Sequence, residues 1–372
     1  MNPRAPAPDL HQVIVECADQ GRLFAVASIL QAQGSTPCQA GAKAVVEAGG
    51  RIHGTIGGGM VEAEAQRLAV DAIRTGRPVV FDFDLQGDAP GGNGPICGGR
   101  VRVLIDPTAK QHRAAYAAAA AAGQRREPGL LLTAIRGGPE PHVTVQFQAD
   151  PAMPLEPGFP SPDTLRAVRQ REQPEFWVAE TQAANERLEI LVEPLLPKPL
   201  LVIVGGGHIG QAVAVQANLV GFEIVVIDDR PEFATAERFP ENVTVQCGPI
   251  GERVGRFPIA ADTYLVIATR SHQHDAEALA ACLRRRAAYI GMIGSRRKVA
   301  RLRQDFVASG RATDAEFERV HAPVGLDIGA RTVPEIATSI VAQLIAVRRR
   351  SPCAASRSGA LTPDPCNKGS RP

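Results

Sequence analysis

The segment LLVIVGGGHIGQAVAVQANLVGFEIVVIDDR, residues 200–230, decides the fold of the second half of the chain. An apolar run, a glycine-rich turn, a helical stretch and a second apolar run follow one another, which is typical of a strand, a helix and a parallel strand. The glycines form the pattern G-x-G-x-x-G, which lets the backbone approach a phosphate at a helix N-terminus. The pattern predicts a nucleotide site; the alternative is a scaffold whose loop holds no dinucleotide. The candidate nucleotide-binding residues are Gly205, Gly207, His208, Gly210, Asp228 and Asp229.

The residues after this segment continue the same alternation. The short apolar runs VTVQCG (243–248), TYLVIAT (263–269) and AAYIGMIG (287–294) are separated by helical stretches. Such a series predicts a Rossmann-like, doubly wound parallel sheet. We expect this domain to cover residues 196–350, and we expect the Ser-, Pro-, Gly- and Arg-rich residues 351–372 to form a disordered tail.

The first half, residues 1–195, mixes helical and strand patterns and predicts a separate α+β domain. AKAVVEAGGRIHGTI (42–56) predicts a hairpin that turns at Gly49 and Gly50. A helix is expected to begin at the glycines 57–59 and to end at Gly76. The Pro-rich residues 150–163 predict a loop.

A further polar cluster follows the predicted strand at 263–269. His272, His274 and Asp275 lie at its carboxyl end, where open α/β sheets bind ligands, and Ser295 follows the next predicted strand. These residues could form a second loop site, as metal ligands or a general base. Equally, they could be a solvated helix N-terminus.

The composition excludes several classes of protein. The formal net charge is +2 over 372 residues, so we expect no nucleic-acid partner. No run of about 18 apolar residues predicts a membrane span, and the cytoplasm follows by default. The seven cysteines are scattered without a C-x-x-C pair, which supports neither a disulfide framework nor a zinc site.

Three segments of the first half carry residues suited to an anionic, metal-bearing ligand. The glycines 57–59 before a helix form a potential anion nest, with Glu62 one turn inside it. Cys97 lies between an Ile and two glycines in a loop, where a chemical role and an inert thiol are both open. Lys43 could neutralise a phosphate or could be exposed. Cys38 is a second thiol near the same loops.

Eight motifs in a fixed order carry a resemblance to the XdhC/CoxI family of accessory proteins for molybdenum hydroxylases. The resemblance spans roughly residues 10–350. Two positions depart from similar sequences: Cys38 stands where Arg is common, and Ser271 where Gly is frequent. The motifs are GSTPCQAGAKAVV, GTIGGGMVEAEA, CGGRVRVLIDP, VIVGGGHIGQAVA, VIDDRPEFA, TRSHQHD, YIGMIGSRRK and HAPVGLDIGARTVPEIATSI.

The resemblance implies a chaperone that binds the molybdenum cofactor, supports its sulfuration together with a cysteine desulfurase, and inserts it into xanthine dehydrogenase or a related enzyme. It is more in keeping with a non-catalytic accessory protein than with an enzyme. A homodimer is expected because closed dimers are the commonest soluble assembly. Cys97 is expected to contact the molybdenum, with Cys38 as the alternative thiol. The expected cofactor-binding residues are Cys97, Gly98, Gly99, Cys38, Lys43, Gly57, Gly58, Gly59 and Glu62.

Two other functions remain open for the Rossmann-like half. It could belong to an NAD(P)-dependent oxidoreductase, or it could be a regulatory sensor that binds NAD(P) or ATP but no pterin. The sequence does not identify the molybdoenzyme that is served.

Overall fold

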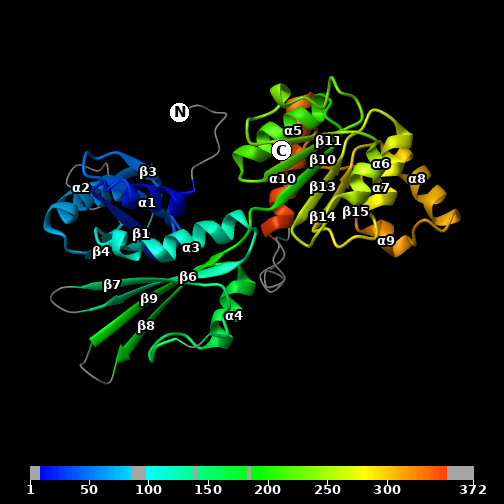
Figure 1. The fold of residues 1–372 in the computed structure, drawn as a ribbon. Coiled ribbons are helices and arrows are strands. Elements are labelled where there is room, and N and C mark those ends of the chain that lie inside the picture. The colour runs from blue at the N-terminus through cyan, green and yellow to red at the C-terminus, as the bar shows by residue number, and fades with distance from the viewer. Residues whose placement is uncertain (1–8, 86–97, 138–140, 154, 182–185, 350–372) are drawn as a thin grey trace, which may run out of the picture.

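The computed structural model describes residues 9–85, 98–137, 141–153, 155–181 and 186–349. Figure 1 shows two lobes, the first coloured blue to green and the second green to red. The chain passes from one to the other between β9, which ends at Leu195, and β10, which begins at Leu200. The expected tail at 351–372 lies outside the described residues.

The first lobe begins with a five-stranded antiparallel sheet in the order β3-β2-β1-β5-β4. Helix α1 (Leu10–Asp19) packs on one face of this sheet and α2 (Gly59–Thr75) on the other, because alternate side chains of β1 enter different cores. The strands are β1 (Phe24–Gln33), β2 (Lys43–Glu47), β3 (Ile52–Gly54), β4 (Val79–Asp84) and β5 (Arg100–Asp106).

The predicted hairpin and helix of this lobe are confirmed. Strands β2 and β3 pair antiparallel around the turn, where the Gly50 amide donates to the Glu47 carbonyl at 2.8 Å. Helix α2 ends at Gly76, whose φ of +70° is the left-handed conformation that glycine adopts most readily.

A four-stranded antiparallel sheet in the order β7-β6-β9-β8 completes the first lobe. Tyr116 of α3 packs in one core with Val26 and Leu104 of the first sheet and Leu131 and Leu191 of the second. The two sheets therefore form one lobe around α1 and α3. Its elements are η1 (Ala109–His112), α3 (Arg113–Gln124), β6 (Gly129–Arg136), β7 (His142–Gln148), α4 (Pro162–Arg171), β8 (Glu175–Thr181) and β9 (Glu186–Leu195).

The second lobe has the doubly wound architecture that the sequence predicts. Six parallel strands stand in the order β12-β11-β10-β13-β14-β15. They are β10 (Leu200–Val204), β11 (Glu223–Asp228), β12 (Thr244–Cys247), β13 (Thr263–Ile267), β14 (Tyr289–Met292) and β15 (Val320–His321). The helices are α5 (His208–Leu219), η2 (Ala236–Arg238), α6 (Ile250–Arg256), α7 (His272–Cys282), α8 (Arg296–Ala308), α9 (Asp314–Glu318) and α10 (Val333–Arg349).

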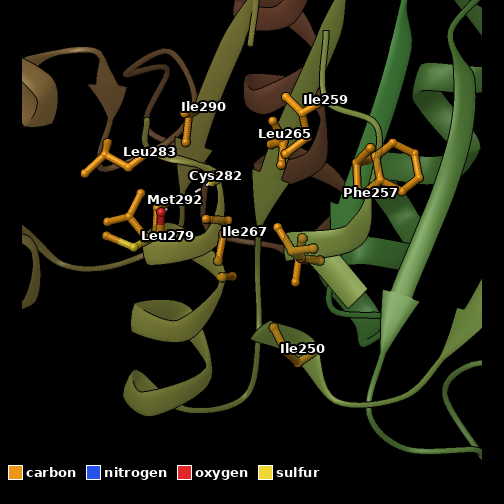
Figure 2. Packing of buried hydrophobic residues seen from close by; sticks show 14 of the residues in the cluster. Ile250, Phe257, Ile259, Leu265, Ile267, Leu279, Cys282, Leu283, Ile290 and Met292 are labelled. Atoms are coloured by element: carbon orange, nitrogen blue, oxygen red, sulfur yellow. Dashed lines mark hydrogen bonds between the residues drawn. The ribbon is translucent and has the colours of Figure 1, made fainter. Parts of the chain in front are cut away.

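Two hydrophobic cores hold the helices against this sheet. Figure 2 shows one of them, where Ile267 and Met292 of the strands lie with Leu279 and Cys282 of α7. On the opposite face, α5 and α10 pack on the same strands. The strand order reverses between β10 and β13, so the loops that follow these strands flank the switch point where such sheets bind ligands.

Among the helices of the described residues, none has both the length and the apolar character needed to cross a membrane.

Candidate functional site

Three glycine-bearing segments of the first lobe meet at one end of its five-stranded sheet. A methyl group on Gly99 would lie 2.5 Å from the Ser35 carbonyl oxygen, and one on Gly57 would lie 2.7 Å from Cβ of Cys38. The loop after β1 thus touches both the segment before β5 and the turn before α2. Because Gly99 is buried against this loop, its close approach is to the protein's own backbone.

The turn before α2 presents an open anion nest. Gly57, Gly58 and Gly59 have φ values of +116°, +73° and +63°, a run that favours glycine at each position. Gly58 begins α2 without a side-chain cap, and a methyl group on Gly58 or Gly59 would meet nothing within 4 Å. No capping side chain occupies the first amides of α2, which are the donors that an anion site at a helix N-terminus would use.

Glu62 braces this nest. Its carboxylate accepts the Ile56 amide at 3.1 Å and the Thr55 hydroxyl at 2.5 Å, and that hydroxyl lies 3.1 Å from the Gly57 amide. Glu62 supports the turn in this structure, and its role in cofactor binding stays a prediction. A carboxylate at this position would repel an anion that came close to it.

The structure describes only one of the two thiols that the sequence assigns to the site. Cys97 lies outside the described residues, directly before the exposed Gly98. Cys38 is 4% exposed in an apolar core, and burial raises the pKa of its thiol. Because the thiolate is the metal-binding form, the geometry does not favour Cys38 as the ligand.

Lys43 does not face these loops as a free cation. It is 7% exposed, and its ammonium donates to the Glu193 carboxylate of β9 in the second sheet. Arg100, the first residue of β5, follows Gly99 directly and is also paired, since its Nε lies 3.1 Å from the Asp84 carboxylate.

In the second lobe, the glycines of the predicted nucleotide loop serve two purposes. A methyl group on Gly205 would lie 2.3 Å from the Ala268 carbonyl, and one on Gly210 would lie 1.9 Å from the Gly205 carbonyl. Both positions therefore need glycine for packing. Gly207, in contrast, begins α5, and a methyl group there would meet nothing within 4 Å; His208 is exposed beside it. The position at the N-terminus of α5 is therefore not crowded by the protein, as the predicted phosphate site requires.

Asp228, the acid at the end of β11, faces inward. It is 1% exposed and binds the Gly206 amide and Arg230. Burial alone would raise the pKa of Asp228, but the hydrogen bonds from Arg230 and the backbone amides outweigh it and lower the pKa. Asp229 is more accessible and pairs with Arg270 of the β13 loop at 2.7 Å.

The residues of the predicted second loop site separate into two groups. Asp275 is fully buried and accepts from Thr269 and from Lys298, whose Nζ lies at 2.5 Å. Ser295 caps α8 by accepting the backbone amide of Lys298 at 3.3 Å, whereas Asp275 accepts the side-chain ammonium of the same residue.

The two histidines are placed elsewhere. His272 is exposed at the start of α7, whereas His274 lies 4.0 Å from Asp229 and 3.7 Å from Glu277. Within the part of the chain that the structure describes, no three His, Cys, Asp or Glu side chains come together as a metal site. The metal-ligand hypothesis for this loop therefore has no geometric support.

Two residues beside the nucleotide loop were missed in the sequence. Arg230 and Arg238 flank the Phe233 ring, with guanidinium carbons 3.7 Å and 4.8 Å from its centroid. Arg238 also reaches the Gly206 carbonyl at 3.4 Å. For Arg230 the sequence did offer a signal, because it follows Asp228, the acid at the end of the second strand of this fold, by two residues.

Comparisons with known proteins agree with this architecture. A model of the XdhC and CoxI family matches residues 17–84, and a model of the XdhC Rossmann domain matches residues 201–344. A crystal structure described as a xanthine dehydrogenase from Bacillus halodurans is 25% identical in sequence, with a TM-score of 0.71. The match covers 95% of this chain and 98% of the chain in that structure.

Two curated proteins are also similar over most of the chain. A protein of Bacillus subtilis (strain 168) described as a probable xanthine dehydrogenase subunit is 27% identical over 335 residues, 87% of this chain and 93% of the relative. The uncharacterized protein YqeB of Escherichia coli (strain K12) is also 27% identical over 335 residues, 90% of this chain, but the match spans only 45% of YqeB. Since both family models match in order, one in each lobe, the chain belongs to the XdhC and CoxI family, and its second lobe is an XdhC Rossmann domain.

Proposed function

We propose that the protein serves the maturation of xanthine dehydrogenase or a related molybdenum hydroxylase by binding the molybdenum cofactor as cargo. It would hold the cofactor while a cysteine desulfurase supplies the sulfur that replaces an oxo ligand, and would then pass it to the apo-enzyme. Family membership and the two relatives described as xanthine dehydrogenase proteins support the association with such an enzyme.

The observation that carries the proposal is the open nest at Gly58 and Gly59. The cofactor is a pterin with a phosphate and a dithiolene-bound metal, so its holder needs anion donors and a soft ligand. The uncapped amides of α2 offer such donors. Cys97 remains the proposed thiol. Its neighbour Gly98 contacts Gly34 in the loop after β1, and Cys38 of the same loop contacts Gly57.

A charge placed in the nest tests this role. Gly58→Asp should reduce the molybdenum-to-protein ratio after gel filtration by about tenfold, since a carboxylate would take the place of the phosphate. Gly58→Ala is the matched control, because it imposes the same backbone strain at a φ of +73° and a ψ of −172° without adding a charge. An equal molybdenum-to-protein ratio in both variants would show that the nest is not part of the cofactor site.

The proposed thiol needs its own pair of variants. Cys97→Ser should lower cofactor retention and activation of the client, because a hydroxyl is a poor soft ligand. Cys17→Ser, a change at a fully buried cysteine, should leave retention unchanged in the protein that folds. If Cys97→Ser activates the client as the wild type does, the thiol is not the ligand.

The proposed partners are testable together. A pull-down from a lysate that contains xanthine dehydrogenase and a cysteine desulfurase should recover both proteins when the cofactor is present. Light scattering should give the mass of a homodimer. Recovery of neither partner would count against the chaperone function.

The glycine loop of the second lobe favours a second candidate, a nucleotide-binding role as an NAD(P)-dependent oxidoreductase or a sensor. The observation is the open approach to Gly207 at the start of α5. An oxidoreductase would consume NAD(P)H, which absorbance records directly, whereas a sensor would bind a nucleotide without turnover.

A further inference from the structure

Asp228 stands where this fold commonly has an acid that binds the ribose, but its carboxylate has no free acceptor position. A carboxylate offers about four lone-pair sites. Oδ2 of Asp228 accepts the Gly206 amide at 2.7 Å and an Arg230 terminal nitrogen at 3.0 Å. Oδ1 accepts the Arg230 amide and its Nε, both at 3.0 Å. The four positions are filled by the protein itself, so a ribose diol would have to displace Arg230.

Arg238, in contrast, has donors to spare. Its terminal nitrogen makes two long contacts, at 3.4 Å to the Gly206 carbonyl and at 3.5 Å to Oε1 of Gln211. Its Nε is buried without a hydrogen-bond partner. A guanidinium carries five N–H donors in a fork that matches phosphate geometry. Because the Nε is buried, a ligand would meet the terminal nitrogens, whose contacts are long.

Several contacts fix the position of Arg238. Gln211 of α5 donates to its carbonyl oxygen at 2.7 Å, and the Phe233 ring contacts the guanidinium groups of both Arg238 and Arg230. The carbonyl of Phe233 packs so closely on Gly206 that a methyl group there would lie 2.5 Å away. The two guanidinium groups therefore stand beside the glycine loop on the side of β11, where the ribose of a nucleotide lies in this fold.

Charged groups of both signs lie near this edge of the sheet. The side chain of Arg253 of α6 lies against Gly248, and the Gly248 amide donates to the Asp228 carbonyl at 3.1 Å. Asp229 is paired with Arg270. Glu232 and Glu237 are exposed on the segment that carries the arginines.

We propose that Arg230 and Arg238 make this site select a nucleotide that carries a phosphate group on its ribose, of the NADP type, over one with a free ribose diol, of the NAD type. The proposal rests on the second candidate function, a nucleotide at the glycine loop, and not on the cofactor-binding role of the first lobe. Asp228 then acts as a positioning residue that holds Arg230 and the loop.

Calorimetric titration of the full chain with NADP⁺, NAD⁺ and AMP tests the preference. NADP⁺ should bind at least about tenfold more tightly than NAD⁺, the size expected for a charge-assisted hydrogen bond. Equal or tighter binding of NAD⁺ would overturn the proposal, and so would the absence of binding by all three nucleotides. Molybdenum retention measured on the same preparation separates these failures from a failure of the chaperone function.

Variants assign the preference to the arginines. Arg238→Ala should lower the affinity for NADP⁺ by about tenfold and leave the affinity for NAD⁺ unchanged, because only the ribose phosphate is lost as a partner. Arg256→Ala is the control, since Arg256 is exposed on α6 and paired with Glu252. Arg238→Lys, which keeps the charge but loses the forked donors, replaces the alanine variant in this test if the alanine variant does not fold. An unchanged preference in a folded Arg238 variant would overturn the assignment.

Discussion

Lys43 shows at the residue scale why a cation cannot be assigned to a ligand from its place in the sequence. The side chains of Lys43 and Glu193 are 5% and 8% exposed, and the two residues are 150 positions apart. Two buried charges of opposite sign satisfy each other, but either one alone is costly. The pair therefore joins the two sheets of the first lobe, and a ligand at the nest would have to compete with Glu193 for it.

Lys43→Met should destabilise the protein by about 3–5 kcal/mol, because it leaves the Glu193 carboxylate buried without a partner. The double variant Lys43→Met, Glu193→Leu should recover most of that loss, since apolar pairs of similar volume replace buried ion pairs well. Urea unfolding of the wild type and both variants is the measurement. A single variant as stable as the wild type would mean that Lys43 is free to bind a ligand.

The element formed by β11 and the glycine loop is held by an ionised carboxylate. Hydrogen bonds lower the pKa of Asp228 below the value of about 3.9 that an unfolded aspartate has. A lowered pKa in the folded state gives stability that is present above the unfolded pKa and is lost as the pH falls through the folded one. The loop should therefore loosen in acid.

Asp228→Asn should lower the free energy of unfolding at neutral pH by about 1–3 kcal/mol, the range for a hydrogen bond to a charged group. The difference from the wild type should shrink below about pH 4, where the wild-type carboxylate also begins to take up a proton. Urea unfolding at both pH values measures it. Asp229→Asn, next in the chain and partly exposed, should cost less at neutral pH. A difference that does not depend on pH would show that Asp228 is not ionised in the folded protein.

Elements whose signals are local could be predicted from the sequence, and those set by distant contacts could not. The turn at Gly49 and Gly50 and the strand, glycine and helix pattern at 200–219 lie within short windows, and both are confirmed. The burial of Cys38 depends on its contact with Gly57, and the carboxylate of Asp228 accepts the amide of Gly206, 22 positions earlier in the chain. Periodicity carries no information about such side-chain contacts.

In the whole molecule, Arg126 ties the two lobes together. It lies two residues after the end of α3 and contacts Glu223 at the start of β11 and Asp262 before β13, the latter at 2.5 Å. Its φ of +58° is unusual for a residue with a side chain. Figure 1 shows α3 reaching from the first lobe toward the second. The bridge therefore holds the end of α3 against the amino-terminal edge of the parallel sheet.

Loss of this bridge should free the lobes without unfolding either one. Arg126→Ala should change the free energy of unfolding by less than about 1 kcal/mol, because the charges are partly exposed. It should nevertheless increase the radius of gyration in X-ray scattering and speed proteolysis between Leu195 and Leu200. Arg126→Gly should loosen the lobes equally yet be more stable than Arg126→Ala by about 1 kcal/mol, since glycine tolerates positive φ. Arg125→Ala, which removes a neighbouring exposed pair with Glu127, is the control. If scattering and cleavage of both Arg126 variants match that control, contacts other than this bridge fix the two lobes, and the position of α3 follows from packing alone.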